Sequence, residues 1–251
     1  RISYTENLKD YQGQLTVGQY DFERALVLGG PQLGPGRLIF GAEFQHSDGP
    51  WDNPADFTKY NGMLRYALGD NRNGFNVTGM AYSADWNSTD QIPQSAIDKG
   101  IIGLYGALDP SDGGKQDRYS LSTEWRRTGE ASRTAVNAYI IRSKLNLFSN
   151  FEFFLGSPDG NQFEQAEKRL ALGGEANHTW FGKLGGKDMS NRVGLQLRRD
   201  RLDRLGRRRG LEHRDPHRHR LGRQQAGGER SLAEPHHLLH PVEIGRASCR
   251  E

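Results

Sequence analysis

The stretch Tyr-Ser-Leu-Ser-Thr-Glu-Trp-Arg, residues 119–126, decides the fold class of this chain. Its larger side chains, those of Tyr119, Leu121, Thr123 and Trp125, alternate with serine, glutamate and arginine. Successive side chains of a β-strand point to opposite faces. The alternation therefore predicts a strand with one mainly apolar face and one polar face.

The same alternation recurs along much of the chain. It is regular in 38–46 and in 192–198, where every second residue is apolar. Further segments are strand-like but less regular: 57–69, 74–86, 132–149 and 167–181. No segment has a sustained helical stripe, and a short helix is expected only within 92–108.

The connections between these segments alternate in length. Long connections are expected at 47–57, 87–117 and 150–166, and short turns at 70–74, 129–131 and 182–190. In an up-and-down barrel every second connection lies on the same side, and outer-membrane barrels have short periplasmic turns and longer extracellular loops. The long connections are therefore predicted to be extracellular. The predicted strands also exceed the usual five or six residues and suit a tilted membrane span.

The composition favours a barrel wall over the other classes of protein. The hydrophobic content is 34%, and no apolar run reaches the roughly 20 residues that a transmembrane helix needs. Disordered chains are poor in aromatic residues, whereas this one has 11 Phe, 9 Tyr and 4 Trp. A soluble antiparallel sheet with one buried face would also show period-two alternation, so that alternative stays open.

Residues 201–251 differ sharply from the rest. They contain no aromatic residue, and they hold 12 Arg, no Lys, six of the eight His and the only cysteine, Cys249. Two functional interpretations are a basic arm for nucleic acid around 207–209 and a metal site at His213, His217 and His219. The interpretation that we favour is a frameshifted tail, because the final residues 243–251 resemble translated adapter sequence. On this interpretation 201–251 is not folded.

A family resemblance extends the argument. The motif Gly-Gln-Tyr-Asp-Phe-Glu-Arg-Ala at 18–25, followed by Gly-Gly-Pro at 29–31, resembles the first barrel hairpin of TonB-dependent receptors. Segments 48–54, 59–62 and 84–93 resemble one proteobacterial branch of that family. The resemblance covers roughly residues 13–200, about half of a barrel that has near 22 strands in the family.

The resemblance implies an all-β fold, an antiparallel up-and-down transmembrane β-barrel fragment of about eight or nine strands. Residues 1–12 are expected to be the end of a plug domain, its linker or a first strand, and 13–200 the partial barrel. The implied function is active uptake of a scarce nutrient (an iron chelate, a vitamin or a carbohydrate) across the bacterial outer membrane. The implied partners are outer-membrane lipid, the small nutrient and the TonB protein, whose N-terminal box is not recognisable here. No cofactor and no nucleic-acid partner are expected.

Candidate ligand-binding residues lie in the predicted extracellular loops. Trp51, Asp52, Trp86 and Asp90 combine rigid aromatic rings with carboxylates, which suits a sugar or an iron chelate. The alternative for the two tryptophans is the aromatic girdle at the membrane interface, and it is favoured for Trp86 by its place at a strand end. The segment 109–114 resembles an acidic calcium loop, but it lacks the full ligand spacing and is predicted to be a turn.

Other functions stay open at this point. A passive porin would share the barrel, and a soluble β-rich carbohydrate-binding protein would share the alternation. An enzyme is not expected, because the sequence has no nucleophile–base pair, metal-ligand spacing or phosphate loop. Glu43 and Glu124 fall on the predicted lumen side, where they are expected to pair with arginines.

Overall fold

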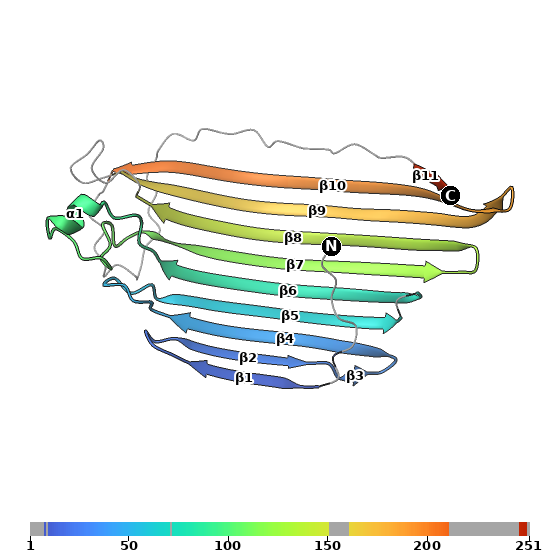
Figure 1. Cartoon of the computed structure of the whole chain (residues 1–251), viewed down its shortest axis with the longest axis horizontal. Coiled ribbons are helices and arrows are strands. Elements are labelled where there is room, and N and C mark those ends of the chain that lie inside the picture. The colour runs from blue at the N-terminus through green and yellow to red at the C-terminus, as the bar shows by residue number, and fades with distance from the viewer. Residues whose placement is uncertain (1–7, 9, 71, 151–160, 211–245, 250–251) are drawn as a thin grey trace, which may run out of the picture.

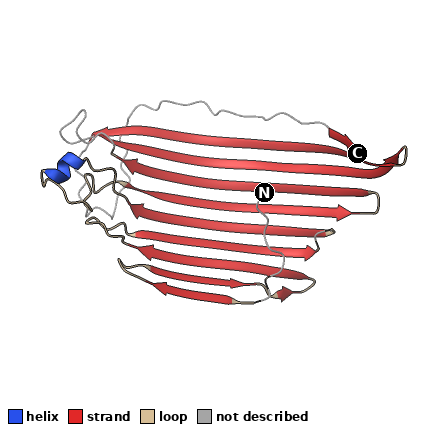
Figure 2. Cartoon of the chain, viewed as in Figure 1, coloured by secondary structure: helices blue, strands red, loops and turns tan. Residues whose placement is uncertain are grey.

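The chain forms one antiparallel sheet in which each long strand pairs with the next (Figures 1 and 2). The computed structural model describes residues 8, 10–70, 72–150, 161–210 and 246–249. The strands are β1 (Gln12–Val17), β2 (Glu23–Gly29), β3 (Gln32–Leu33), β4 (Gly36–Ser47), β5 (Phe57–Gly69), β6 (Gly74–Asn87), β7 (Gly113–Thr128), β8 (Ser132–Ser149), β9 (Asn161–Leu184), β10 (Lys187–Gly210) and β11 (Arg246–Cys249).

The connections alternate in length as the sequence predicts. The short turns 70–73, 129–131 and 185–186 lie at one end of the sheet, and the long connections 48–56 and 88–112 lie at the other (Figure 1). We call the second end the loop end. The helix α1 (Gln94–Asp98) lies there, within the stretch expected to hold a short helix. Among the described residues, no helix is long and apolar enough to cross a membrane.

One face of the sheet, which we call the apolar face, is exposed and rich in large hydrophobic side chains. Register fixes its members, since Leu121 on β7 lies between Gly79 on β6 and Ile140 on β8. Its exposed members include Leu15, Val27, Tyr60, Leu64, Tyr119, Leu121, Trp125, Val136, Ile140, Leu172, Leu195 and Leu197. No other described part of the chain covers these side chains, and large exposed apolar patches of this kind mark interaction surfaces.

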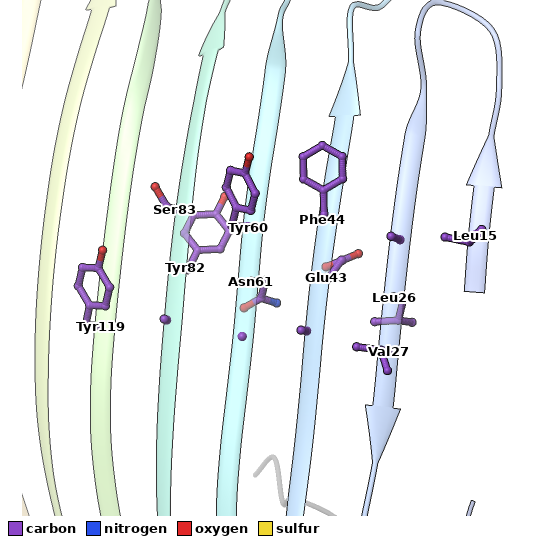
Figure 3. Close-up of a pocket in the computed structure, with 14 residues that line it drawn as sticks. Leu15, Leu26, Val27, Glu43, Phe44, Tyr60, Asn61, Tyr82, Ser83 and Tyr119 are labelled. Atoms are coloured by element: carbon purple, nitrogen blue, oxygen red, sulfur yellow. The ribbon is translucent and has the colours of Figure 1, made fainter. Parts of the chain in front are cut away.

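A hollow of about 720 Å³ lies on the apolar face where neighbouring strands carry small residues. Ala42, Gly62 and Ala81 align across β4, β5 and β6 and leave the space. Figure 3 shows Tyr60 and Tyr119 projecting from their strands around this hollow.

The opposite face, the polar face, carries paired charges. Glu43 accepts a hydrogen bond from Arg24 Nε at 2.6 Å and lies 3.1 Å from Lys59 Nζ. Glu124 lies 3.5 Å from Arg126 and accepts from Asn76 Nδ2 at 3.4 Å. The expectation that both glutamates pair with arginines on the polar side is confirmed. Buried hydrophobic side chains are few among the described residues, as expected for a two-faced wall without a central core.

Two details differ from the sequence expectations. The sheet contains β1 to β11, more strands than the eight or nine expected, because β1, the short β3 and β11 also pair. The expected boundary at residue 200 does not coincide with a strand end, since β10 pairs with β9 as far as Gly210 and β11 pairs with β10. The proposed metal residues His213, His217 and His219 lie outside the described residues, as do most of residues 1–12.

Candidate ligand-binding loops at one end of the sheet

The two long loops at the loop end are joined to each other by hydrogen bonds. Asp52 N donates to Tyr105 O at 3.0 Å, and Asn53 Nδ2 donates to Pro110 O at 3.3 Å. The end of β6 also joins the first loop, because Asn87 N donates to Ala55 O at 2.7 Å. Loops 48–56 and 88–112 therefore form one continuous surface at the loop end.

An exposed aromatic pair lies on this surface. The rings of Trp51 and Tyr105 meet edge to face with centroids 6.2 Å apart, and 40% of Trp51 is exposed. Asp52 is also exposed beside this pair. Flat aromatic faces next to a carboxylate can pack against the apolar side of a ligand while the carboxylate accepts its hydrogen bonds. The sequence identified Trp51 and Asp52 but missed Tyr105, since nothing local links residue 105 to residue 51.

Trp86 lies elsewhere, on the polar face. It pairs with Gly114, and a Cβ built on that glycine would lie 2.6 Å from the Trp86 ring. Its neighbour Asp85 projects to the other side, where its carboxylate lies 3.7 Å from Lys115 Nζ. The girdle interpretation of Trp86 is therefore wrong, because a girdle residue must project from the lipid-facing side. The structure does not bring Trp86 into contact with the pair formed by Trp51 and Tyr105.

Asp90 belongs to a cluster of carboxyl groups around Asn150. The backbone N–H of Asn150 donates to Asp90 Oδ2 at 3.0 Å and to Asp112 Oδ2 at 3.1 Å. Its side-chain Nδ2 donates to Asp109 Oδ2 at 2.8 Å. Asp112 is 1% exposed, Asp109 5% and Asn150 3%. We call Asp90, Asp109, Asp112 and Asn150 the aspartate cluster.

The start of β9 closes the cluster from the other side. Gln162 Nε2 donates to Ser111 Oγ at 2.7 Å and to Asp112 Oδ1 at 3.3 Å. Asp109 also accepts from Ser111 N at 3.0 Å, and Asp112 N donates to Asp109 O at 3.2 Å, which makes 109–112 a turn. The expectation of a turn at this acidic segment is confirmed. The turn locks the 88–112 loop to the ends of β8 and β9.

Burial, together with the neighbouring carboxyl groups of Asp90 and Asp109, raises the pKa of the Asp112 carboxyl to about 8. Gln162 acts in the opposite direction by donating a hydrogen bond to the ionised form. At neutral pH the folded protein therefore holds Asp112 mainly protonated. The protonated carboxyl can then share its hydrogen with Asp90 instead of repelling it.

We expect stability to fall as the pH rises from about 4 to about 8, because the unfolded state loses the Asp112 proton in this interval while the folded state keeps it. Because the pKa is raised on folding, the folded state holds this proton more tightly than the unfolded state. The stabilising contribution is complete below the ordinary aspartate pKa of about 4 and is lost as the pH rises through about 8. The measurement is the midpoint of thermal unfolding between pH ~5 and pH ~9, with Asp112→Asn as the variant.

The asparagine keeps the shape and neutrality of the protonated acid, so Asp112→Asn should flatten the profile between about pH 5 and about pH 8. Asp98→Asn is a control on the exposed helix α1, and it should leave the wild-type profile unchanged. An Asp112→Asn profile that still falls as steeply as that of the wild type would contradict the protonated cluster.

The meander order, the continuous register and the two unlike faces define the chain as the wall of an up-and-down β-barrel. No protein-family model matches the sequence, and no curated protein matches it. A solved structure described as the ferric citrate transporter FecA in the unliganded form is similar, with a TM-score of 0.63 and 8% identity. The match covers 78% of this chain and 29% of that chain, so the chain spans under a third of the transporter's length. At this identity the likeness establishes a shared fold.

Proposed function

We propose that the chain is part of an outer-membrane receptor that takes up a scarce nutrient with energy supplied through the TonB protein. The proposal rests on two features of one sheet. The sheet has an exposed apolar face, and the loops at its loop end expose side chains that can bind a ligand. The apolar face suits lipid, which requires backbone groups to be paired and favours apolar side chains on the lipid-facing side. The paired charges of the polar face suit a water-filled or plugged lumen.

The proposed orientation follows from the loops. Long connections of outer-membrane barrels lie outside the cell, so the loop end is the extracellular end. The exposed group of Trp51, Asp52 and Tyr105 then meets the nutrient first. An iron chelate, a vitamin and a carbohydrate all offer an apolar surface together with polar groups that such a site can bind. The similar solved structure is named as a ferric citrate transporter, which supports the first of these classes.

The proposed function is tested by nutrient uptake in intact cells. The gene is deleted in its own bacterium, and uptake of labelled iron chelates, cobalamin and oligosaccharides is measured with and without a functional TonB protein. The expected result is that one of these nutrients is no longer accumulated in either mutant. Loss in the gene deletion alone would identify a passive porin instead. Recovery of the protein in the soluble fraction without detergent would refute the membrane assignment.

Trp51→Ala is expected to weaken nutrient binding about tenfold or more, because it removes an exposed ring that is held in place by Tyr105. The readout is uptake as a function of nutrient concentration, with the amount of receptor in the membrane measured in parallel. Trp180→Ala is the matched control, since Trp180 is 49% exposed but lies near the short turn at 185–186. Equal effects of the two substitutions would count against the loop-end site.

A further inference from the structure

A second group of ligand-type side chains lies at the loop end, and it shares no residue with the Trp51–Tyr105 pair or the aspartate cluster. Asp21, His46 and Asp48 each offer a nitrogen or oxygen ligand atom, and these atoms all lie within 4.8 Å of one another. Asp21 comes from the turn between β1 and β2, His46 is the penultimate residue of β4, and Asp48 starts the next loop. Among the described residues this is the one group of its kind that contains a histidine.

Backbone pairing holds the three residues together. Glu23 on β2 pairs with His46 on β4, which places the β1–β2 turn directly beside the end of β4. Asp48 N then donates to Tyr20 O at 2.9 Å, which joins the loop to the turn beside Asp21. The ligand atoms are therefore brought together by the sheet register and by a loop-to-turn hydrogen bond, and not by chance contact of long side chains.

A hydrogen bond between Nδ1 and a threonine hydroxyl orients the His46 ring. His46 Nδ1 lies 3.1 Å from Thr58 Oγ1 on the neighbouring strand β5. In the neutral tautomer in which Nδ1 donates to Thr58, the other ring nitrogen is unprotonated and able to bind a metal ion. That other nitrogen, Nε2, faces Asp48 Oδ1 at 3.6 Å. Thr58 therefore occupies the position of the hydrogen-bond partner that commonly orients a metal-binding histidine.

The spacing fits an ion between the ligands better than a direct hydrogen bond. A distance of 3.6 Å exceeds ordinary N–H···O contacts of about 2.7–3.2 Å. Tetrahedral bonds of about 2.0–2.2 Å place two ligand atoms roughly 3.4 Å apart, close to the distance found here. The carboxylates of Asp21 and Asp48 also provide the negative charge that a divalent cation needs. The carboxylate of Asp56 lies on the other side of the ring, 4.0 Å from Nδ1.

We propose that Asp21, His46 and Asp48 form a binding site for a divalent first-row transition metal ion of the Zn²⁺ class. Imidazole nitrogen with carboxylate oxygen suits Zn²⁺ and its neighbours, whereas Ca²⁺ and Mg²⁺ prefer all-oxygen sites. Three protein ligands leave one tetrahedral position for water or another small ligand. The site is independent of nutrient binding at Trp51, so either assignment can fail without the other.

The test is Zn²⁺ titration of the whole protein in detergent, after chelator treatment, followed by isothermal calorimetry. His46→Gln should remove one Zn²⁺ site per chain, and Asp48→Asn should weaken the same site at least tenfold. Thr58→Val should weaken it about 10- to 100-fold, because the ring loses its orienting partner. Histidines beyond residue 210 are the same in every variant, so any zinc that they bind cancels in the comparison.

The matched control is His178→Gln. His178 Nδ1 also contacts a threonine hydroxyl, Thr134 Oγ1 at 2.8 Å, but no described carboxylate group gathers around it. This variant should bind zinc as the wild type does. Should His46→Gln lose its β-sheet circular dichroism spectrum, Asp21→Asn, a change at an exposed turn residue, replaces it with an expected weakening of at least tenfold. Zinc binding that is unchanged in a correctly folded His46→Gln or Asp21→Asn variant overturns the proposal.

Discussion

Leu121→Arg is expected to destabilise the protein in a lipid bilayer by about 2–4 kcal/mol, the cost of a cation on the lipid side near the membrane midplane. Leu121 lies in the middle of β7 and is 52% exposed on the apolar face. Its strand neighbours Gly79 and Ile140 offer no polar partner for a guanidinium group. The measurement is reversible urea unfolding of the protein folded into phospholipid vesicles.

The matched control is Ser120→Arg, one position earlier on the same strand. Ser120 projects to the polar face, where an arginine can reach water or a carboxylate, so we expect a change below about 1 kcal/mol. A soluble sheet would give the opposite order, because the exposed Leu121 would tolerate a charge. Equal losses for the two variants would show that the apolar face does not contact lipid.

Arg65→Leu is expected to cost about 3 kcal/mol of folding free energy, because it removes a donor from buried acceptors. Arg65 is 5% exposed and donates from one guanidinium nitrogen to Asn76 Oδ1 and Thr78 Oγ1, each at 2.9 Å. Asn76 and Thr78 are 5% and 2% exposed, so water cannot readily replace the lost donor. The same vesicle unfolding experiment measures the loss.

Arg142→Leu provides the comparison for this second experiment. Arg142 is exposed and pairs with Tyr119, which places it on the apolar face. Replacing it by leucine should leave stability unchanged or raise it, because an outward-facing charge is removed. An Arg65→Leu variant as stable as Arg142→Leu would mean that the buried network contributes little to folding.

Much of the fold could be predicted from the sequence because its determinants are local. Alternation in segments such as 119–126 specifies which side chains share a face, whatever strand lies beside them. The alternation of long and short connections specifies an up-and-down order without any knowledge of register. Glu43 and Glu124 could be assigned to the polar side for the same reason, and the structure places both there.

The candidate sites could be predicted only in part. Trp51 and Asp52 were identified because they lie in a predicted loop, whereas their partner Tyr105 belongs to another loop. The position of Trp86 was misjudged because a strand end says nothing about which face a side chain takes until the register is known. Asp112 resembled an ordinary turn residue in the sequence, and its protonation depends on burial and on the carboxyl groups of Asp90 and Asp109 that the fold brings beside it.

The sequence by itself determined the class of strand, the sidedness of its residues and the order of the connections, because each of these depends on neighbours two to a few residues away. The tertiary structure alone decided which distant groups meet. The meeting of Asp21 with His46 and Asp48 depends on the β2–β4 register, and the aspartate cluster depends on where β8 ends and β9 begins. A shift of one residue in register would turn every side chain of a strand to the other face and separate these groups.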